Sequence, residues 1–392
     1  MPNAYPKMTA QIEARVAQKG PLVIRGVRRA GKTTLLDHAR RQALSLPGQP
    51  TEFVLHRVQN TDFFTEDMAT RSPEERKIAF HKMISQDVSR QVAANLERDF
   101  DEILRQCLSS NNAIACGARI LSDASTRPLM LVDEIPYAGS RSDVTKIHEL
   151  WKTYLSYLAE ADSAMKIAEG SSLLSIHCYM DLRLESLIKD MLPIDTPQFY
   201  MRGVSSNQES VEWLRKTLKT KSEIPVYDGF TKGKYRGASD EFLMGVINLW
   251  GGYVGGILRT VYAILKYVGQ LDEARPLDID DVGVKMITNK GTLSSHDIKV
   301  IWKLLDNTQK KLLIYFGKED YLDASNLSQY ERDSLKMMEQ AGWLNENSGL
   351  IYTLRGGYLF HAFLLGQSFL LGEPRASKQQ YNALFRKYMG TN

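Results

Sequence analysis

The stretch Gly26-Val27-Arg28-Arg29-Ala30-Gly31-Lys32-Thr33 decides the fold of this 392-residue chain. It fits the pattern G-x-x-x-x-G-K-[ST] of a phosphate-binding loop. The apolar residues 21–24 before it are typical of a buried strand, and the residues after it, through Arg41, favour a helix. Glycines let backbone N–H groups close around phosphate oxygens, and the start of the following helix adds a favourable dipole. The alternative is an ordinary glycine-rich turn, but such a turn would not require a buried strand before it and a helix after it.

The residue types in this loop are those that hold ATP. Lys32 is expected to reach the β- and γ-phosphates, and the hydroxyl of Thr33 is expected to ligate Mg²⁺. The other members of the predicted nucleotide site in this stretch are Gly26, Arg28, Arg29, Ala30, Gly31 and Thr34. The sequence therefore predicts a site for ATP with Mg²⁺.

A second motif bears on whether the nucleotide is hydrolysed. Residues 129–132 read Leu-Met-Leu-Val, as a buried strand does, and Asp133 and Glu134 follow directly. Asp133 would bind Mg²⁺ through water, and Glu134 would polarise the attacking water, which makes Glu134 and Lys32 the predicted catalytic residues. A strand ending in a solvated Asp-Glu pair has the same pattern, but the upstream loop favours the hydrolytic interpretation. The long separation of the two motifs implies an insertion between them.

Composition limits the class of protein. The net charge of +4 is only mildly basic, so charge alone does not indicate a nucleic-acid partner. The 3 cysteines show neither metal-ligand spacing nor a disulfide framework, which favours a reducing cytoplasm. The apolar stretch 245–265 contains Asn248, Arg259 and several glycines, so it predicts a buried helix pair and no membrane span. The length suggests two or three domains.

Apolar runs that alternate with helical patterns predict an α/β fold with a parallel sheet between helices. Strands are expected at residues 21–24, 53–55, 129–132, 165–168 and 199–201. Helices are expected at residues 1–20, 142–161 and 211–218, and a helical insertion at about 72–110. Ser72-Pro73-Glu74-Glu75 is a start signal for that insertion, and residues 206–209 read as a capping box.

The segment 215–236 is the most basic part of the chain. Its cations are Arg215, Lys216, Lys219, Lys221, Lys232, Lys234 and Arg236, and Tyr227, Phe230 and Tyr235 lie among them. Such a mixture suits contact with a phosphate backbone and stacking on bases. A solvated helix edge and loop has the same composition and is the commoner case, so non-specific DNA binding stays a second interpretation.

The C-terminal third predicts a winged helix-turn-helix. Helices at 306–317, 324–329 and 330–341 are followed by a hairpin of residues 342–344 and 350–352. In a DNA reader of this kind the third helix enters the major groove. Here that helix carries Glu331, Asp333 and Glu339 beside Arg332 and Lys336. A structural or protein-contacting role therefore fits it as well as DNA reading does.

These motifs resemble those of one family. Residues 26–36 are similar to the loops of prokaryotic AAA+-type ATPases of the STAND and archaeal-ATPase group, which often read G-x-R-R-x-G-K-T-T-L, and residues 132–135 resemble their Walker B motif. The predicted fourth strand leading into Gly170-Ser171 resembles a family strand ending in Gly-Ser, which makes Ser171 a candidate γ-phosphate sensor. Residues 250–255 resemble the glycine motif of their lid helices, without the proline common there. Arg259 sits where related initiator ATPases carry a lid arginine.

The resemblance implies a P-loop NTPase sheet of order 5-1-4-3-2, a helical lid, a C-terminal winged helix and ATP-dependent switching. The predicted domains are a core at 1–205, a lid region at 206–292, a winged helix at 293–371 and a tail at 372–392. An ATP-dependent homo-oligomer and a task linked to DNA or to defence are typical of the group. Slow hydrolysis is expected, because Arg141, Arg183 and Arg202 are each better explained as surface or ion-paired residues than as an arginine finger.

Two functions from different classes remain open. The first is an ATPase that couples ATP binding and hydrolysis to a change in assembly or partner binding. The second is a non-catalytic regulator that holds nucleotide as a structural ligand while its winged helix binds a protein. A small-molecule kinase is disfavoured, since the tandem Asp133-Glu134 suits activation of water.

Overall fold

The computed structural model divides into two compact units. The sheet unit comprises Lys7–Val27 and Lys32–Tyr200, and the helical unit comprises Met1–Pro6, Arg28–Gly31 and Met201–Asn392. The structure describes residues 4–17, 22–27, 30–45, 50–55, 66–132, 170–177, 196–223, 235–268, 275–280 and 305–389, with parts of 150–167, 185–189, 273 and 298–303. The domain boundaries expected from the sequence remain predictions.

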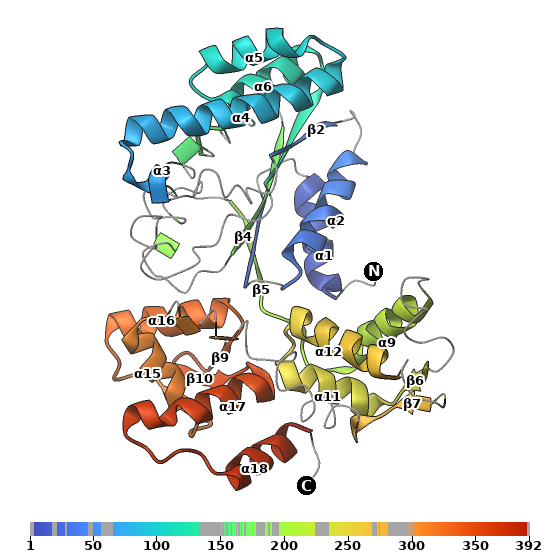
Figure 1. The fold of residues 1–392 in the computed structure, drawn as a ribbon, viewed down its shortest axis with the longest axis vertical. Coiled ribbons are helices and arrows are strands. Elements are labelled where there is room, and N and C mark those ends of the chain that lie inside the picture. Colours follow the sequence, from blue (N-terminus) through green and yellow to red (C-terminus); the bar gives the residue numbers. More distant parts are fainter. Residues whose placement is uncertain are drawn as a thin grey trace. The chain divides into compact units, whose positions relative to one another are not determined.

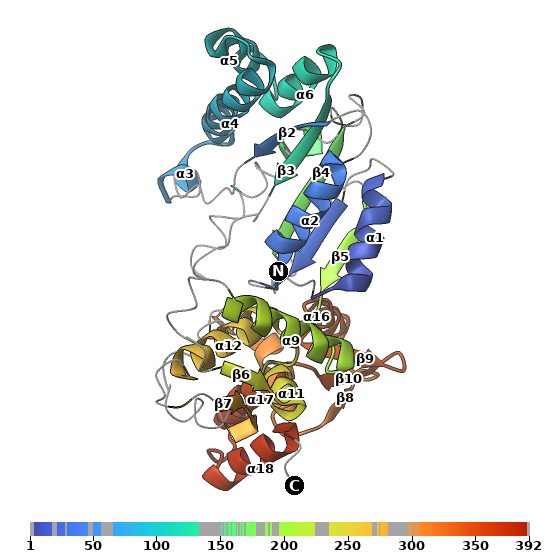
Figure 2. The same cartoon turned by 90° about the vertical axis from the view of Figure 1, so that its right-hand side faces the viewer.

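A five-stranded sheet forms the centre of the sheet unit, with the strand order β2-β3-β4-β1-β5 (Figures 1 and 2). The strands are β1 (Leu22–Gly26), β2 (Pro50–Leu55), β3 (Arg127–Val132), β4 (Ser171–His177) and β5 (Gln198–Met201). β1 runs parallel to β4, β4 to β3, and β3 to β2. This is the predicted order 5-1-4-3-2, so the predicted α/β fold class is confirmed.

β1 is the inner strand that leads into the phosphate-binding loop. It lies between β4 and β5, and every one of its residues is buried. Parallel strands are covered on both faces, which explains why β1 reads as a nearly continuous apolar run. Helix α2 (Lys32–Leu44) begins directly after the loop and packs on β1 and β4. The helix expected before β1 is α1 (Pro6–Ala17), which buries Ile12 and Val16.

The fourth strand differs from the prediction. Met165 and Ile167, which the sequence placed in a strand, are helical, and β4 begins only at Ser171. The amide of Gly170 donates to the carbonyl of Met165 at 2.8 Å and so ends the helix. A Cβ on Gly170 would lie 2.6 Å from the carbonyl oxygen of Pro128, so only glycine fits at this turn. The short apolar alternation at 165–168 was therefore misread, because a helix end and a strand share it.

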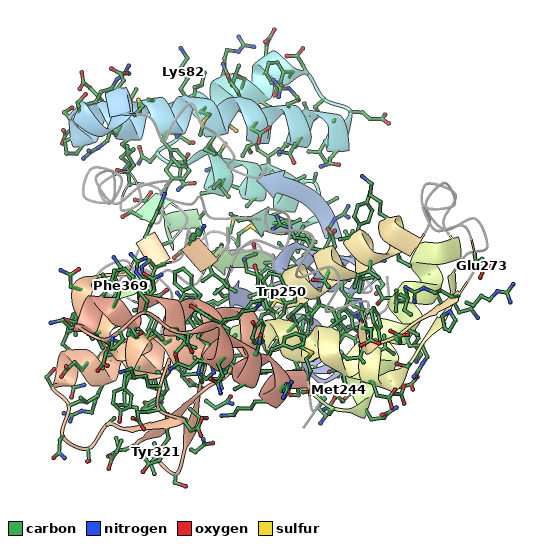
Figure 3. The ribbon with its side chains drawn as sticks, turned by 60° about the horizontal axis from the view of Figure 1, so that its bottom comes forward. Lys82, Met244, Trp250, Glu273, Tyr321 and Phe369 are labelled. Atoms are coloured by element: carbon green, nitrogen blue, oxygen red, sulfur yellow. The ribbon has the colours of Figure 1, made fainter. Side chains whose placement is uncertain are left out.

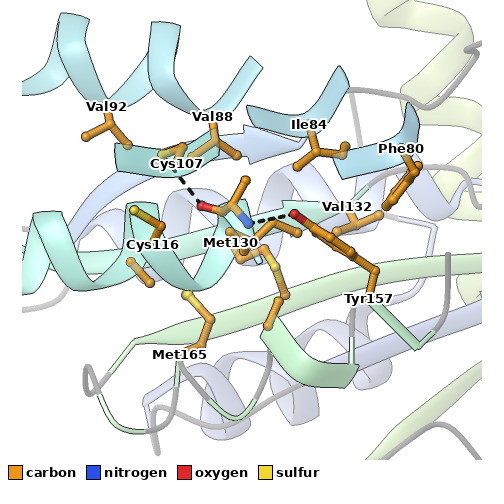
Figure 4. Close-up of a cluster of buried hydrophobic side chains, with 14 of the residues drawn as sticks. Phe80, Ile84, Val88, Val92, Cys107, Cys116, Met130, Val132, Tyr157 and Met165 are labelled. Carbon is orange, nitrogen blue, oxygen red and sulfur yellow. Dashed lines mark hydrogen bonds between the residues drawn. The ribbon is translucent and has the colours of Figure 1, made fainter. Parts of the chain in front are cut away.

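Helices fill the long connection between β2 and β3, as the separation of the two motifs predicted. They are α3 (Glu66–Thr70), α4 (Pro73–Leu96), α5 (Phe100–Ser109) and α6 (Ala113–Asp123), of which α3 and α6 were not predicted. α4 begins at the predicted signal, where Ser72 and Glu75 form a capping box. Figure 4 shows α4, α5 and α6 packed around Tyr157 and β3, and the hydroxyl of Tyr157 accepts from the amide of Ala113 at 2.6 Å.

The apolar stretch 245–265 forms a helix pair, as predicted. Its helices are α11 (Asp240–Trp250) and α12 (Val254–Val268), which form a buried cluster with α9 (Gln208–Glu223). The indole of Trp250, labelled in Figure 3, donates to the hydroxyl of Thr260 at 2.8 Å and so links the pair. A short parallel pair of strands, β6 (Tyr235–Ala238) and β7 (Arg275–Leu277), accompanies them. Among the described helices, none has the length and apolar character needed to span a membrane.

The cap of α9 differs from the predicted capping box. The side chain of Asn207 accepts from the amide of Ser210 at 3.0 Å, so Asn207 is the capping residue. The hydroxyl of Ser206 instead donates to the side-chain oxygen of Asn248 at 2.6 Å. Ser206 therefore fixes the start of α9 to α11, a tertiary contact that the local sequence does not indicate.

Residues 306–354 contain two helices and a three-stranded antiparallel sheet, where the sequence predicted three helices and a hairpin, so the winged helix stays a prediction. α15 (Asn307–Tyr315), β8 (Tyr321–Asp323), α16 (Gln329–Gln340), β9 (Leu344–Asn347) and β10 (Ile351–Leu354) follow in turn, and the sheet order is β8-β10-β9. The predicted helix at 324–329 is wrong, because residues 324–328 form a turn between β8 and α16, which begins at Gln329. The side chain of Asp323 accepts from the amide of Ser325 at 2.8 Å, which supports a turn instead of a helix.

The segment expected as a tail contains a helix. α17 (Gly357–Gln367) and the short helix η1 (Ser368–Leu371) lead to α18 (Lys378–Met389). The amide of Asn248 on α11 donates to the carbonyl of Tyr388 at 3.0 Å, and α18 also packs on α17. The end of the described chain is thus held by both α11 and α17.

Candidate nucleotide-binding site

The phosphate-binding loop follows the carboxyl end of β1, the edge at which parallel sheets bind ligands. Gly26 ends the strand, and Lys32 begins α2, so the loop leads into a helix N-terminus. Gly31 has φ +100°, a backbone conformation that other residues rarely adopt. Val27 and Ala30 are buried. Arg28 and Arg29 lie outside the described residues, so their expected contacts with nucleotide stay predictions.

Lys32 is buried inside the loop that it is predicted to serve. The residue is 3% exposed, and its Nζ donates to the carbonyl oxygen of Val27 at 3.0 Å. Taking an ammonium group out of water is costly unless it is paired. Phosphate oxygens would offer stronger, charge-assisted acceptors at the same place. The buried cation and the glycine turn therefore fit a bound polyphosphate.

Mg²⁺ would have to be held by oxygen ligands near this loop. Thr33, half-buried, and Thr34, exposed, lie in the first turn of α2. Hydroxyl and carboxylate oxygens are the ligand types that Mg²⁺ takes beside nucleotide phosphates. In the part of the chain that the structure describes, no cluster of three or more His, Cys, Asp or Glu side chains could hold a metal by itself. Thr33 and Asp133 remain the predicted ligands.

Tyr5 is a residue of this site that no sequence motif indicates. Its hydroxyl donates to the carbonyl oxygen of Ala30 at 3.0 Å. Its ring carbon Cε2 lies 3.8 Å from the position that a Cβ on Gly31 would take. Burial raises the pKa of the Tyr5 hydroxyl, which therefore stays a hydrogen-bond donor. Tyr5 thus fixes the loop's backbone just before Lys32.

The strand register identifies which end of β4 meets the loop. Gly26 is paired with His177, the last residue of β4. Ser171, the first residue of that strand, is paired with Leu129. These two ends of β4 are about 20 Å apart at the rise of an extended strand. The prediction that Ser171 senses the γ-phosphate is therefore wrong, and it failed because the fourth strand was placed before Gly170 instead of after it.

The predicted Walker B carboxylates follow a buried strand. Val132, the last residue of β3, is paired with Leu174, which is paired in turn with Val23. These three residues form one row across the sheet. The row crosses β1 at Val23, three residues before Gly26. Asp133 and Glu134 come next in sequence and lie outside the described residues. Their predicted roles stay predictions, supported by the strand that leads to them.

The structure gives partners for two of the singled-out arginines. Arg202 forms an ion pair with Glu339 at 2.5 Å, as expected for a residue that is not an arginine finger. Arg215 contacts Glu212 at 2.5 Å and also Asp240, so its charge is neutralised locally. Arg259 is half-buried on α12, and its predicted contact with phosphate stays a prediction. Arg141, Arg183 and residues 224–234 of the basic segment lie outside the described residues.

Comparison with known proteins yields only distant likeness. No protein-family model matches this chain, and no curated protein does. Cdc6p from Pyrobaculum aerophilum aligns with a TM-score of 0.42 at 9% identity, over 98% of this chain and 94% of that one. The ORC2 protein of Aeropyrum pernix in its ADP form aligns with a TM-score of 0.41 at 11% identity, over 97% of this chain and 94% of that one. Such values carry no argument about activity.

Proposed function

We propose that the protein binds ATP with Mg²⁺ at the loop 26–34 and hydrolyses it slowly, as an ATPase of AAA+/STAND type. The observation that carries this proposal is Lys32, a buried cation in a glycine loop at the carboxyl end of β1. A buried ammonium beside a helix N-terminus has little structural use and a direct use in holding phosphates. The strand order places the loop at the carboxyl end of β1, and the residues of the loop provide the groups that would bind phosphate.

In this proposal each group has a defined task. Lys32 neutralises the β- and γ-phosphates, and amides of the loop donate to their oxygens. Thr33 and Asp133 hold Mg²⁺, which when bound offsets negative charge on the phosphates. Glu134 orients the attacking water and accepts its proton. Turnover is slow, because Arg202, a candidate arginine finger within the described residues, is paired with Glu339.

Replacing Glu134 with Gln tests hydrolysis separately from binding. The amide is similar in size but cannot act as a base, so ATP binding should persist while turnover falls by about 10²–10⁴. Steady-state phosphate release and calorimetric ATP titration measure the two properties. Undiminished hydrolysis in Glu134→Gln would show that residues 133–134 are not the catalytic carboxylates.

The consequence of ATP binding is proposed to be a change in assembly or in partner binding. An ATP-dependent homo-oligomer and a DNA-linked or defence process are supported only by the resemblance of the loop and of residues 132–135. Non-specific DNA binding through 215–236 is supported by its cations. Anisotropy titrations with duplex and single-stranded DNA at low and high salt test it, because phosphate contacts weaken steeply with salt.

A non-catalytic regulator remains the second candidate, favoured by the surface of the winged helix. The cations of α16 are already engaged, since Lys336 contacts Glu346 at 3.5 Å and Arg332 donates to the carbonyl of Leu327 at 2.6 Å. Residues 306–354 hold 8 acidic and 5 basic side chains. This surface suits a protein partner better than a phosphate backbone. This candidate would be favoured if the wild type binds ATP but shows no turnover, or only turnover that persists in Glu134→Gln.

A further inference from the structure

One buried ion pair lies directly beside the phosphate-binding loop and has no part in the roles given so far. Arg25 immediately precedes Gly26 on β1, and its side chain is 4% exposed. Its guanidinium pairs with the carboxylate of Glu185, whose side chain is 14% exposed. It also donates to the side-chain oxygen of Gln198 at 3.3 Å and to the hydroxyl of Tyr200 at 3.3 Å. A buried cation thus occupies an inner strand of the sheet, next to the edge strand β5, where an apolar residue would ordinarily lie.

Stability does not explain this arrangement. Burying both charges removes them from water, and replacing such a pair with apolar residues is often neutral or stabilising. A guanidinium is planar and directs its N–H groups along fixed lines, so it constrains its partners more closely than an apolar contact does. Its central carbon also lies 5.4 Å from the centre of the Tyr200 ring, which adds a further directional contact. The pair is therefore better explained by the positions that it fixes.

The partners of Arg25 are Gln198 and Tyr200 on β5, and Glu185, which lies between β4 and β5 in the sequence. β4 and β5 lie on opposite sides of β1 in the sheet, and residues 178–197 connect them in sequence. Glu185 belongs to this connection, and its ion pair with Arg25 places Glu185 against β1. The connection begins after His177, which is level with Gly26. Arg25 thus joins β1, the edge strand β5 and Glu185 at the end of the sheet that carries the loop.

We propose that Arg25 and Glu185 are positioning residues for ATP hydrolysis. Arg25 holds Glu185 and the edge strand β5, through Gln198 and Tyr200, in a fixed place relative to β1 and the phosphate-binding loop that follows it. ATP affinity comes from the loop and Lys32 and does not need this bond. Hydrolysis needs it, because a misplacement of about 1 Å in an active site can cost about a hundredfold in rate. The inference rests on the proposed ATPase function.

The double variant Arg25→Met/Glu185→Met tests this role, because it removes both charges and leaves no unpaired one. We expect its kcat to fall about 10- to 100-fold while its KM and ATP Kd stay near those of the wild type. Its thermal unfolding should stay cooperative, since replacing a buried ion pair with apolar residues of similar volume is often neutral. The matched control is Arg98→Met/Glu102→Met, which removes an exposed ion pair of 2.6 Å between Arg98, just before α5, and Glu102 on α5, and should leave kcat unchanged.

Arg25→Lys is the second variant, and it keeps the charge while losing the planar fork. A positioning role predicts a fall in kcat here as well, with ATP Kd unchanged. Wild-type kcat in either folded variant would overturn the inference. So would a folded double variant that loses ATP affinity along with turnover, because the pair would then act on binding. Absence of turnover in the wild type refutes the proposed function instead, so the two failures are distinguishable.

Discussion

The glycine of the phosphate-binding loop and the glycines of the turn between α11 and α12 share a backbone conformation but differ in their surroundings. Gly31 has φ +100°, and a Cβ there would meet only ordinary contacts, at 3.6 Å from Met201 and 3.8 Å from Tyr5. Gly252 has φ +83°, and a Cβ there would lie 1.8 Å from the carbonyl oxygen of Val204. Gly31 leaves room beside the backbone of the loop, and Gly252 allows its own backbone to contact that of Val204. Glycine is therefore required by the backbone conformation in one region and by close packing as well in the other.

The largest effect is expected at the turn. Gly252→Ala forces a backbone overlap at a positive φ, which should lower the free energy of unfolding by about 2–5 kcal/mol. Gly349→Ala is the matched control, because Gly349 has φ +84° with no atom within 4 Å of its added Cβ. The control should lose only about 1–2 kcal/mol. Urea denaturation of both variants measures the difference, and equal losses would show that packing is not what selects glycine at Gly252.

At the loop glycine, Gly31, we expect a small loss of stability and a large loss of ATP affinity. Gly31→Ala should cost about 1–2 kcal/mol of stability from its positive φ alone. Its ATP affinity should fall at least about tenfold, because a shifted backbone no longer aims its amides at the phosphates. Denaturation and calorimetry on the same preparation separate the two quantities. An unchanged affinity would mean that Gly31 does not shape a nucleotide site.

The smallest effect concerns pH and the contact between α17 and α18. Burial lowers the pKa of His361, whose Nδ1 lies 3.1 Å from the hydroxyl of Tyr388, and Lys387 also lowers it while Asp320 opposes the shift. The unfolded chain then binds the proton first as pH falls. Stability is therefore full above about pH 6.5 and declines below it, at most by about 1.4 kcal/mol per pH unit.

His361→Gln should flatten the decline that begins near pH 6.5. Asp320, whose pKa Lys387 lowers, contributes only at lower pH, since its stabilisation is lost as that carboxylate takes up a proton. Denaturant midpoints at a series of pH values measure the slope. An identical slope in His361→Gln and wild type would assign the pH dependence to another group.

The sequence predicted what depends on local pattern. β1, the loop, β3 and the start of α4 at Ser72 were found, because apolar runs, glycine spacing and capping signals act over a few residues. The place of β4 was not found, since it depends on Gly170 fitting against Pro128. The same is true of Tyr5, whose bond to Ala30 spans distant parts of the sequence. The ion pair of Arg25 and Glu185 likewise follows from strand order, which single residues do not encode.

The central claim is that Lys32 makes this loop a nucleotide site, and an ATP titration by calorimetry with Mg²⁺ present tests it most directly. The account predicts saturable binding by the wild type and by Lys82→Ala, which removes an exposed lysine of α4 (Figure 3). It predicts no measurable binding by a folded Lys32→Ala variant, because the main cation on the β- and γ-phosphates is gone. A Lys32→Ala affinity within about threefold of wild type would contradict the account, since losing that charge should cost far more.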